Sequence, residues 1–434
     1  MKAVVVFEEP IREPDTLYLQ PGVNVTTSER IFSQTFGTPT SLEKDLLILA
    51  SAIFACDLAF KRGQRENVPR KIELTVPVVN LAAFKSVLDE LRYTLFVLSH
   101  DAWDIRFTQK NGAPESPQNW SQDATGKVLL FSGGLDSFAA AIQYGEAGEN
   151  VQLVSHITAN RVVSSSQETL SAYLQVRFPN QFDRIAFRIS GRSKPAEGFP
   201  FPSDRDREES QRTRSFLFLS LAALTARRRG LSDVILIAEN GQMAIHLPLT
   251  AGRISAFSTH TAHPEFVHEM GNLMSTLLSH SIHVENPFLY QTKAEVIHNV
   301  LENHQAIFKD TVSCWKASRV TSVHNHCGTC VPCLVRRIAV EAQGYEISEY
   351  QRDILKEDVG KLSPEDEGKR NLIDLLEFVH IFNSNSTQAF LENLYPELIN
   401  VRIDSTRAVE MYRRFAAEAY SVVERYPLIS ELVK

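Results

Sequence analysis

The stretch from residue 127 to residue 147 constrains the fold of this chain more than any other. Residues 127–131 (KVLLF) form an apolar run without alternation, which is typical of a strand buried on both faces of a parallel sheet. An Ala-rich stretch reaches residue 147 after the turn Ser132-Gly133-Gly134-Leu135-Asp136-Ser137. The pattern predicts a strand, a tight turn and a helix in direct succession.

Two further apolar runs, residues 151–157 and 233–238, predict more buried strands, and residues 203–229 predict a long helix between them. Strands and helices then alternate as they do in an open, doubly wound parallel sheet. We therefore predict an α/β fold in which ligands bind at the carboxyl ends of the strands.

The SGGLDS turn has the composition of an anion-binding loop. Gly133 and Gly134 let the backbone turn tightly and approach a ligand, and a helix start offers free N–H groups to a phosphate. Ser132 and Ser137 add hydroxyl donors. Asp136 would repel phosphates unless a Mg²⁺ ion lies between them or the carboxylate binds a loop N–H. The turn lacks the GK[ST] ending of a Walker loop.

Four of the five cysteines fall in one short window, at Cys314, Cys327, Cys330 and Cys333. Four thiolates with two x₂ spacings suit a tetrahedral, structural Zn²⁺ site. A ligand supplied by His324 or His326, an iron–sulfur cluster, and unmetallated core thiols are the alternatives. Cys56 stands alone in an apolar run and is expected to be a buried core thiol.

The flanking regions differ in pattern from this central part. Residues 1–122 are expected to form an accessory α/β module, with helices at 42–59 and 82–98, a strand at 71–78 and a returning strand at 103–107. Residues 109–125, rich in Gly, Pro, Asn and Ser, are the predicted linker. After a nucleotide-binding domain at 126–345, residues 346–434 are expected to be helical, with helices at 366–382, 386–395 and 406–426.

Composition excludes several classes of function. The net charge of −7 argues against broad, non-specific binding of nucleic acid, although a local basic groove stays possible. An uncharged apolar run of about 18 residues, as a membrane span requires, is absent from the sequence. The first residues lack the long apolar core of a secretory signal. We therefore expect a cytoplasmic protein.

The SGGLDS turn after an apolar strand resembles the SGGxDS signature of the PP-loop ATP pyrophosphatases. This superfamily includes GMP synthetase, NAD synthetase, asparagine synthetase, tRNA-thiolating enzymes and the 7-cyano-7-deazaguanine synthase QueC. The resemblance implies a PP-loop (HUP-like) fold, with ATP and Mg²⁺ used to activate a substrate oxygen as an adenylate. Pyrophosphate is released, and a nucleophile then displaces AMP.

The order of SGGxDS, then Ser313-Cys314, then residues 327–337 (CGTCVPCLVRR) resembles QueC in particular, over roughly residues 126–345. QueC converts 7-carboxy-7-deazaguanine into a nitrile with ATP and ammonia, so the resemblance implies an ATP-dependent, carbon–nitrogen bond-forming ligase with a zinc knuckle at 314–333. It also implies roles for Arg212 and Arg214 in binding pyrophosphate and for Lys293 in neutralising the α-phosphate.

Polar residues after the strand at 233–238 are further candidates. Glu239, Asn240 and Gly241 lie where a sheet of this kind binds ligands, and they could read the edge of a deazapurine. A polar loop at 258–264 offers His260 and His263 as a base or substrate clamp. The adenine pocket is expected near residues 155–158.

This chain is about twice as long as the biosynthetic QueC enzymes, and it therefore looks more like the long QueC-like proteins of Qat and type IV CBASS anti-phage systems. In that setting ammonia or a protein amine would accept the activated deazaguanine, and other defence subunits would be partners. A tRNA-thiolating enzyme and a non-enzymatic nucleotide-binding subunit are the alternatives. The former needs a redox-active Cys pair, whereas the latter need not keep Asp136 and Ser137.

Overall fold

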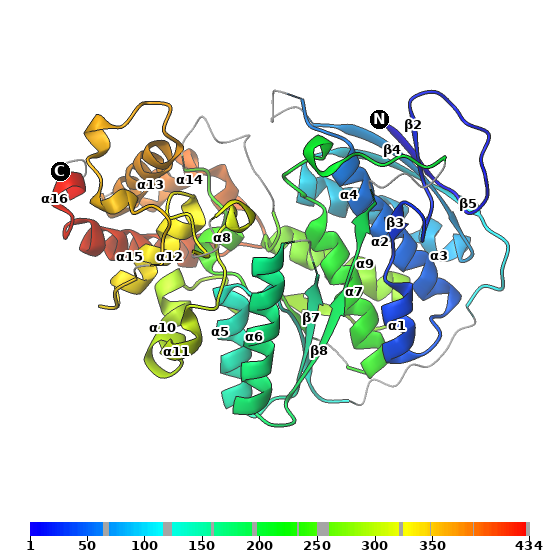
Figure 1. Ribbon diagram of the computed structural model, residues 1–434, viewed down its shortest axis with the longest axis horizontal. Helices are drawn as coiled ribbons and strands as arrows, with labels where there is room; N and C mark the ends of the chain where they lie inside the picture. The colour runs from blue at the N-terminus through cyan, green and yellow to red at the C-terminus, as the bar shows by residue number, and fades with distance from the viewer. Residues whose placement is uncertain are drawn as a thin grey trace.

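The computed structural model describes residues 1–63, 69–115, 124–157, 160–192, 198–231, 234–249, 260–320, 324–347, 349–384 and 386–430. Two parallel sheets and a group of carboxyl-terminal helices make up this part of the chain (Figure 1). None of its helices is long and apolar enough to cross a membrane.

The first sheet has the strand order β2-β1-β4-β5 and is parallel throughout. Its strands are β1 (Lys2–Val5), β2 (Thr16–Leu19), β4 (Lys71–Val78) and β5 (Ala102–Gln109). Every second residue of β4 is buried, as its alternating sequence predicts. The strands expected at 71–78 and 103–107 are therefore confirmed.

Four helices accompany this sheet: α1 (Glu29–Phe36), α2 (Ser41–Ala59), α3 (Leu81–Ser86) and α4 (Leu88–Ser99). The capping box of Thr40 and Glu43 starts α2 where the sequence predicted a helix. The expected helix at 82–98 is confirmed in its extent but is divided into α3 and α4, because the backbone leaves helical geometry at Val87, with φ −111° and ψ 14°.

The second sheet has the order β11-β10-β6-β7-β8, and its strands are also all parallel. They are β6 (Lys127–Leu130), β7 (Val151–His156), β8 (Phe182–Phe187), β10 (Val234–Leu236) and β11 (His283–Glu285). The chain runs from β6 outward to β8 and returns to β10 on the other side of β6. This confirms the doubly wound fold, and its switch point, where ligands bind, lies between β6 and β10.

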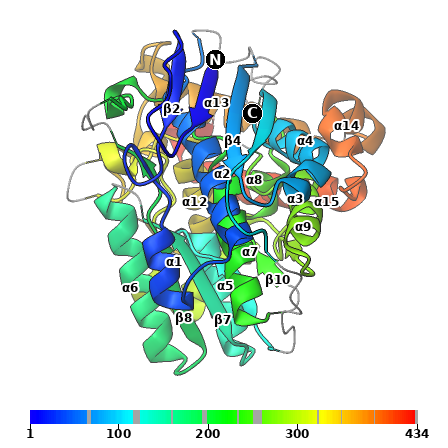
Figure 2. The same ribbon diagram turned by 90° about the vertical axis from the view of Figure 1, so that its right-hand side faces the viewer.

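Helices cover both faces of this sheet. One face packs against α5 (Leu135–Glu146), α6 (Arg161–Arg177) and α10 (Lys293–Asn303), and the other against α7 (Arg214–Arg229) and α9 (Pro264–Leu278). One apolar core joins α7 and α9 to α2 and the first sheet, which lies above the second in Figure 2. The antiparallel pair β3 (Val25–Thr26) and β9 (Ser190–Gly191) also connects the two. The proposed domain boundaries stay predictions.

The long helix expected at 203–229 is wrong in its first half. A 3₁₀ turn at Asp204–Asp206 is followed by non-helical chain, and α7 begins only at Arg214. The carboxylate of Asp57 on α2 accepts from the backbone N–H and the hydroxyl of Thr213, at 2.7 and 3.0 Å. This long-range cap fixes the start of α7. Of the predicted linker, residues 116–123 lie outside the described part of the chain.

The carboxyl-terminal part is helical, as predicted. It contains α12 (Val331–Glu341), α13 (Glu367–Asn383), α14 (Gln388–Leu394), α15 (Ser405–Val423) and α16 (Pro427–Ser430). A third core cluster joins these helices to Ile245 and Leu247, which lie in and just after the short helix α8 (Gly241–Ile245). The remaining short helices are α11 (Gln305–Phe308) and 3₁₀ turns at Ala317–Arg319, Ile354–Lys356, Val359–Lys361 and Pro396–Ile399.

Candidate active site

The turn between β6 and α5 has the geometry of a phosphate-binding loop. Gly133 has φ +79°, and a Cβ there would lie 3.0 Å from Gln167 and 3.1 Å from Ser166 on α6, so only glycine fits. Gly134 is the N-cap of α5, and no side chain caps this helix. The first N–H groups of α5 therefore lack intrahelical acceptors and form a favourable place for an anion.

The loop is held in shape by its own hydroxyls and by neighbouring segments. The Ser132 and Ser137 hydroxyl oxygens lie 3.2 Å apart, and Ser137 donates to the Gly134 carbonyl at 3.0 Å. The Gly133 carbonyl accepts from the Ser166 hydroxyl at 2.8 Å and from the Val312 N–H at 3.0 Å. The loop is thus tied to the segment that precedes the first cysteine of the cluster.

Three charged or polar side chains converge on this loop from different elements. Lys293, the first residue of α10, donates to the Asp136 carboxylate on α5 at 2.5 Å. The side-chain amide of Asn240, just after β10, donates to the other Asp136 oxygen at 2.9 Å. Each of the three residues is at most 6% exposed, so the ion pair is desolvated, and removal of either partner would leave a buried, unpaired charge.

Glu239 brings a second carboxyl group to Asp136. Burial raises the pKa of Glu239 well above its usual value, and the neighbouring Asp136 carboxylate raises it further. Burial acts to raise the pKa of Asp136 as well, but the Lys293 ammonium and the hydrogen bonds from its neighbours outweigh burial and lower it. Two carboxyl groups that compete for one proton are a donor set that fits Mg²⁺, which prefers oxygen ligands.

These groups line a cavity of about 170 Å³ at the switch point of the sheet. Its walls comprise Ser132, Gly134, Leu135, Asp136, Ser137, Ala238, Glu239, Asn240, Met243, Lys293, Val312, Ser313, Trp315, Pro332 and Val335. The predicted loop and strand-end residues are therefore brought together, although Gly133 and Gly241 stand behind the lining. The sequence interpretation missed Trp315, which is 58% exposed. Its position directly after Cys314 was the available signal.

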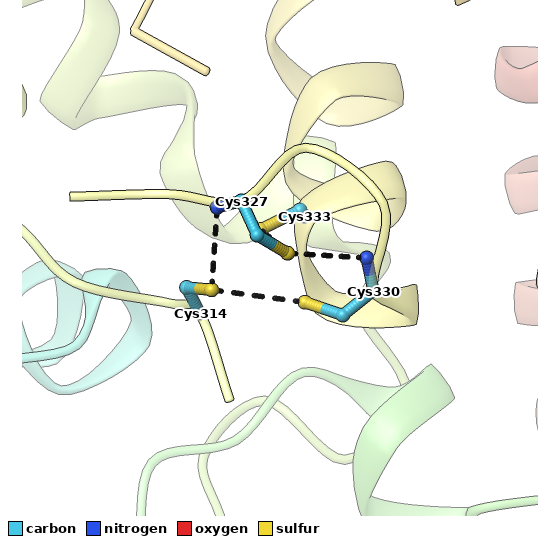
Figure 3. Close-up of side chains that lie close together, drawn as sticks. All are labelled: Cys314, Cys327, Cys330 and Cys333. Atoms are coloured by element: carbon cyan, nitrogen blue, oxygen red, sulfur yellow. Dashed lines mark hydrogen bonds between the residues drawn. The ribbon is translucent and has the colours of Figure 1, made fainter. Parts of the chain in front are cut away.

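The four cysteines form one compact cluster beside this cavity (Figure 3). Their sulfur atoms all lie within 4.8 Å of one another, and the Cys314–Cys330 and Cys327–Cys333 pairs are both 3.9 Å apart. A tetrahedral zinc ion with Zn–S bonds of about 2.3 Å places its sulfurs about 3.8 Å apart. The cluster therefore fits a single zinc ion, whereas an iron–sulfur cluster would spread its ligands around a larger body.

Backbone N–H groups complete the knuckle. Lys316 and Cys327 donate to the Cys314 sulfur at 3.3 and 3.4 Å, and Cys330 donates to the Cys327 sulfur at 3.4 Å. His326 lies outside this group of ligand atoms, and its Nε2 atom accepts from the Ser313 N–H at 3.2 Å. The structure therefore favours four cysteine ligands.

Arg212 and Arg214 lie away from the cavity lining. Arg212 precedes α7 and donates to the Ser99 carbonyl at 3.2 Å, next to α4. Burial lowers its pKa to about 10, and the nearby Arg62 adds to the shift. The Arg214 guanidinium stacks over Phe218 at 5.0 Å. A pyrophosphate-binding role for either residue stays a prediction that this arrangement does not support.

The other candidates are not part of the cavity lining. His260 contacts Val97 of α4 and His100, the residue after this helix, and His263 caps α9 by accepting from the Glu265 N–H at 3.3 Å. In the expected adenine pocket, the Ser155 hydroxyl donates to the Phe131 carbonyl at 2.9 Å. Thr158, Ser258 and Thr259 lie outside the described residues.

The fold and the site can now be compared with known proteins. The family model described as "Queuosine biosynthesis protein QueC" matches residues 126–344, just over half of the 434 residues. The match covers the phosphate-binding loop, Glu239, Asn240, Lys293 and the whole cysteine cluster. No curated protein matches the chain.

Proposed function

This chain belongs to the QueC family and is an ATP-using enzyme of the PP-loop type, and from this premise we propose its reaction. It adenylates 7-carboxy-7-deazaguanine, releases pyrophosphate and transfers the activated carboxyl group to an amine. The observation that supports this most directly is the buried cluster of Asp136, Glu239, Asn240 and Lys293 at the start of α5. Charge is concentrated there at the switch point of the sheet.

The chemistry proceeds in two displacements. A carboxylate oxygen of the substrate attacks the α-phosphorus of ATP, and the bond from that phosphorus to the pyrophosphate oxygen breaks. An amine nitrogen then attacks the acyl carbon, loses a proton and expels AMP. With ammonia the product is an amide. A second ATP can adenylate the amide oxygen, which releases pyrophosphate and one N–H proton, and loss of AMP and the second N–H proton then leaves the nitrile.

Different residues around the cavity bind the phosphates, the metal ion and the substrate ring in this proposal. The first N–H groups of α5 and the hydroxyls of Ser132 and Ser137 bind the departing pyrophosphate. Lys293 neutralises charge at the α-phosphate, for which it must exchange part of its contact with Asp136. Asp136 and Glu239 would hold Mg²⁺, which neutralises phosphate charge when it is bound. Trp315 offers an exposed aromatic face for the flat deazapurine ring.

The cysteine cluster supports this site structurally rather than chemically. It would hold zinc with all four thiolates, which leaves no open coordination position. It presents Val312, Ser313 and Trp315 to the phosphate-binding loop. Burial raises the pKa of the remaining thiol, Cys56, so none of the five cysteines suits sulfur transfer. This argues against the tRNA-thiolating alternative.

The regions outside the family match bear on the acceptor. Residues 1–125 and 345–434 fall outside it, and the parts of them that the structure describes share apolar cores with the matched region. A chain that only added ammonia would not need them, so we favour a protein amine as the acceptor, with ammonia as the alternative. This would place the enzyme with the long QueC-like proteins of anti-phage systems, whose other subunits would be its partners.

The test uses purified protein with Mg-ATP, 7-carboxy-7-deazaguanine and ammonia, with pyrophosphate and product mass as readouts. We expect substrate-dependent pyrophosphate release that Asp136→Asn abolishes. The matched control, Asp89→Asn, changes a carboxylate that is 95% exposed on α4 and should leave the rate unchanged. The proposal would be contradicted if pyrophosphate release does not depend on the deazaguanine, or if Asp136→Asn still releases pyrophosphate. ATP binding without turnover would favour the non-enzymatic alternative.

A further inference from the structure

Helix α15, which lies outside the family match, packs against α8, α10 and α12. Two of these helices begin at the cavity. Helix α8 starts directly after Glu239 and Asn240, and the first residue of α10 is Lys293. Residues that hold the starts of α8 and α10 therefore control where the charged groups of the cavity stand.

The first contact is made on α8 by Tyr412, which is 1% exposed. Its hydroxyl donates to the Gln242 carbonyl at 3.3 Å and accepts from the Leu247 N–H at 3.4 Å. Beside it, the methyl group of Met411 lies 2.8 Å from the place where a Cβ on Gly241 would stand. The Leu289 carbonyl oxygen lies closer still to that place, so this backbone group requires the glycine, while Met411 of α15 packs against the same segment.

The second contact is made on α10 by Glu418. Its carboxylate accepts from the hydroxyl of Thr292 at 2.6 Å. Thr292 is the fully buried N-cap of α10, and its hydroxyl oxygen also accepts from the Glu295 N–H at 3.2 Å. Glu418 therefore orients the hydroxyl that caps the helix starting at Lys293.

Gln242 links the residue contacted by Tyr412 to the start of α10. Its side-chain oxygen accepts from the backbone N–H of Lys293 at 3.1 Å, while its carbonyl accepts from Tyr412. The other charged groups near Glu418 are Glu295 and Arg414, which pair with each other at 2.7 Å. Burial raises the pKa of Glu418 to about 7, because the ionised carboxylate loses its hydration there. An exposed glutamate would not have this desolvation cost.

We propose that Glu418 and Tyr412 of α15 are positioning residues for the reaction at the cavity, acting through Thr292 and Gln242 on Lys293. This rests on the proposed function, since Lys293 is the group that neutralises the α-phosphate. The carboxyl-terminal helices are then part of the active site of this chain and not an independent attachment. A residue that acts only through Lys293 loses its effect when Lys293 is absent.

The experiment compares Glu418→Ala, Lys293→Ala and the double variant in the full chain. Both Mg-ATP affinity by calorimetry and substrate-dependent pyrophosphate release are measured. We expect Glu418→Ala to lower kcat about tenfold, and the double variant to match Lys293→Ala in both measurements. Glu418→Gln, which keeps an acceptor for the Thr292 hydroxyl, and Tyr412→Phe should lose less. The control is Glu410→Ala, an exposed residue of α15.

Each outcome decides a different point. Glu418→Ala with wild-type kcat, or a double variant in which the two losses multiply, would overturn the positioning role. If Glu418→Ala does not fold, Glu418→Gln and Tyr412→Phe serve in the same double-variant comparison. If wild-type protein releases no pyrophosphate, the proposed function fails. The positioning role would then stand if Glu418→Ala weakens Mg-ATP binding while Lys293→Ala and the double variant bind Mg-ATP equally, and it would fall if Glu418→Ala binds like wild type or if the two Lys293 variants differ.

Discussion

The cysteine cluster and the phosphate-binding cavity lie side by side but are built in opposite ways. The cluster draws its four ligands from two short segments, Cys314 and Cys327–Cys333, and its sulfurs suffice for a closed tetrahedral site. The cavity draws Asp136, Glu239 and Lys293 from three distant elements and keeps two carboxyl groups in competition. A site that is complete in itself is structural, whereas one that holds two buried carboxyl groups beside a single lysine, with the pKa of one of them raised, is prepared for a ligand.

The largest effect is expected from opening the cluster. Cys330→Ser should abolish zinc binding and lower the unfolding temperature strongly, because structural zinc contributes on the order of 10 kcal/mol to the folding of small zinc domains. Zinc content by mass spectrometry and a thermal melt provide the measurement. Cys56→Ala, which changes the cysteine outside the cluster, should keep the metal. Full zinc content in Cys330→Ser would refute the four-cysteine site.

The next largest effect should separate the two regions. Lys293→Met should reduce pyrophosphate release by about 100- to 1,000-fold, the usual loss when one stabilising group of a transition state is removed. Zinc content should stay at the wild-type level because Lys293 is not part of the cluster. Lys309→Met, an exposed residue shortly after α10, is the control. Loss of zinc in Lys293→Met would show that the two sites are not separable.

A smaller effect should show how the cluster is joined to the cavity. His326→Ala removes the acceptor of the Ser313 N–H and should destabilise the fold by about 1–3 kcal/mol, as expected for a buried donor left unpaired. Zinc should be retained. Chemical denaturation and metal analysis provide the measurement. A stoichiometric loss of zinc would instead make His326 a ligand, as the sequence allowed.

The smallest effect is expected for His263, which lies outside both sites. Burial lowers the pKa of His263 to about 4, below the value of about 6.5 expected in the unfolded chain. The unfolded chain then binds more protons between these pH values, so the stability is complete above pH 6.5 or so and is lost as the pH falls towards 4. His263→Asn keeps a helix-capping side chain and should flatten the pH dependence of the melting temperature between pH 5 and about 7. An unchanged slope would contradict this assignment.

The sequence predicts best those parts of the two sites whose residues lie close together in the chain. The phosphate-binding loop and the cysteine cluster are local: their residues are close in the chain, and their spacing alone indicates the chemistry. The strand-end residues Glu239 and Asn240 followed from the sheet, because the carboxyl ends of parallel strands meet at one edge. These expectations needed no knowledge of which distant segments touch.

Apart from the break at Val87, the features that the sequence did not predict depend on distant contacts. The start of α7 is set by Asp57 on α2, a contact that the expected helix at 203–229 did not include. Arg212 donates to the Ser99 carbonyl, and its role in binding pyrophosphate stays a prediction. Trp315 reaches the cavity because the cysteine cluster folds its segment against Gly133. The contacts of α15 with Thr292 and Gln242 join residues that are 126 and 170 positions apart in the sequence. No periodicity in a single sequence reports such pairs.

The most direct test of the central claim is the exchange of labelled pyrophosphate into ATP, because it detects a reversible adenylate without any acceptor. With Mg²⁺ and 7-carboxy-7-deazaguanine, we predict exchange in wild-type protein and none in Asp136→Asn or without the deazaguanine. Exchange that occurs without the deazaguanine would contradict adenylation of this substrate at the cavity. The same holds if zinc-bound wild-type protein shows no exchange with the deazaguanine present.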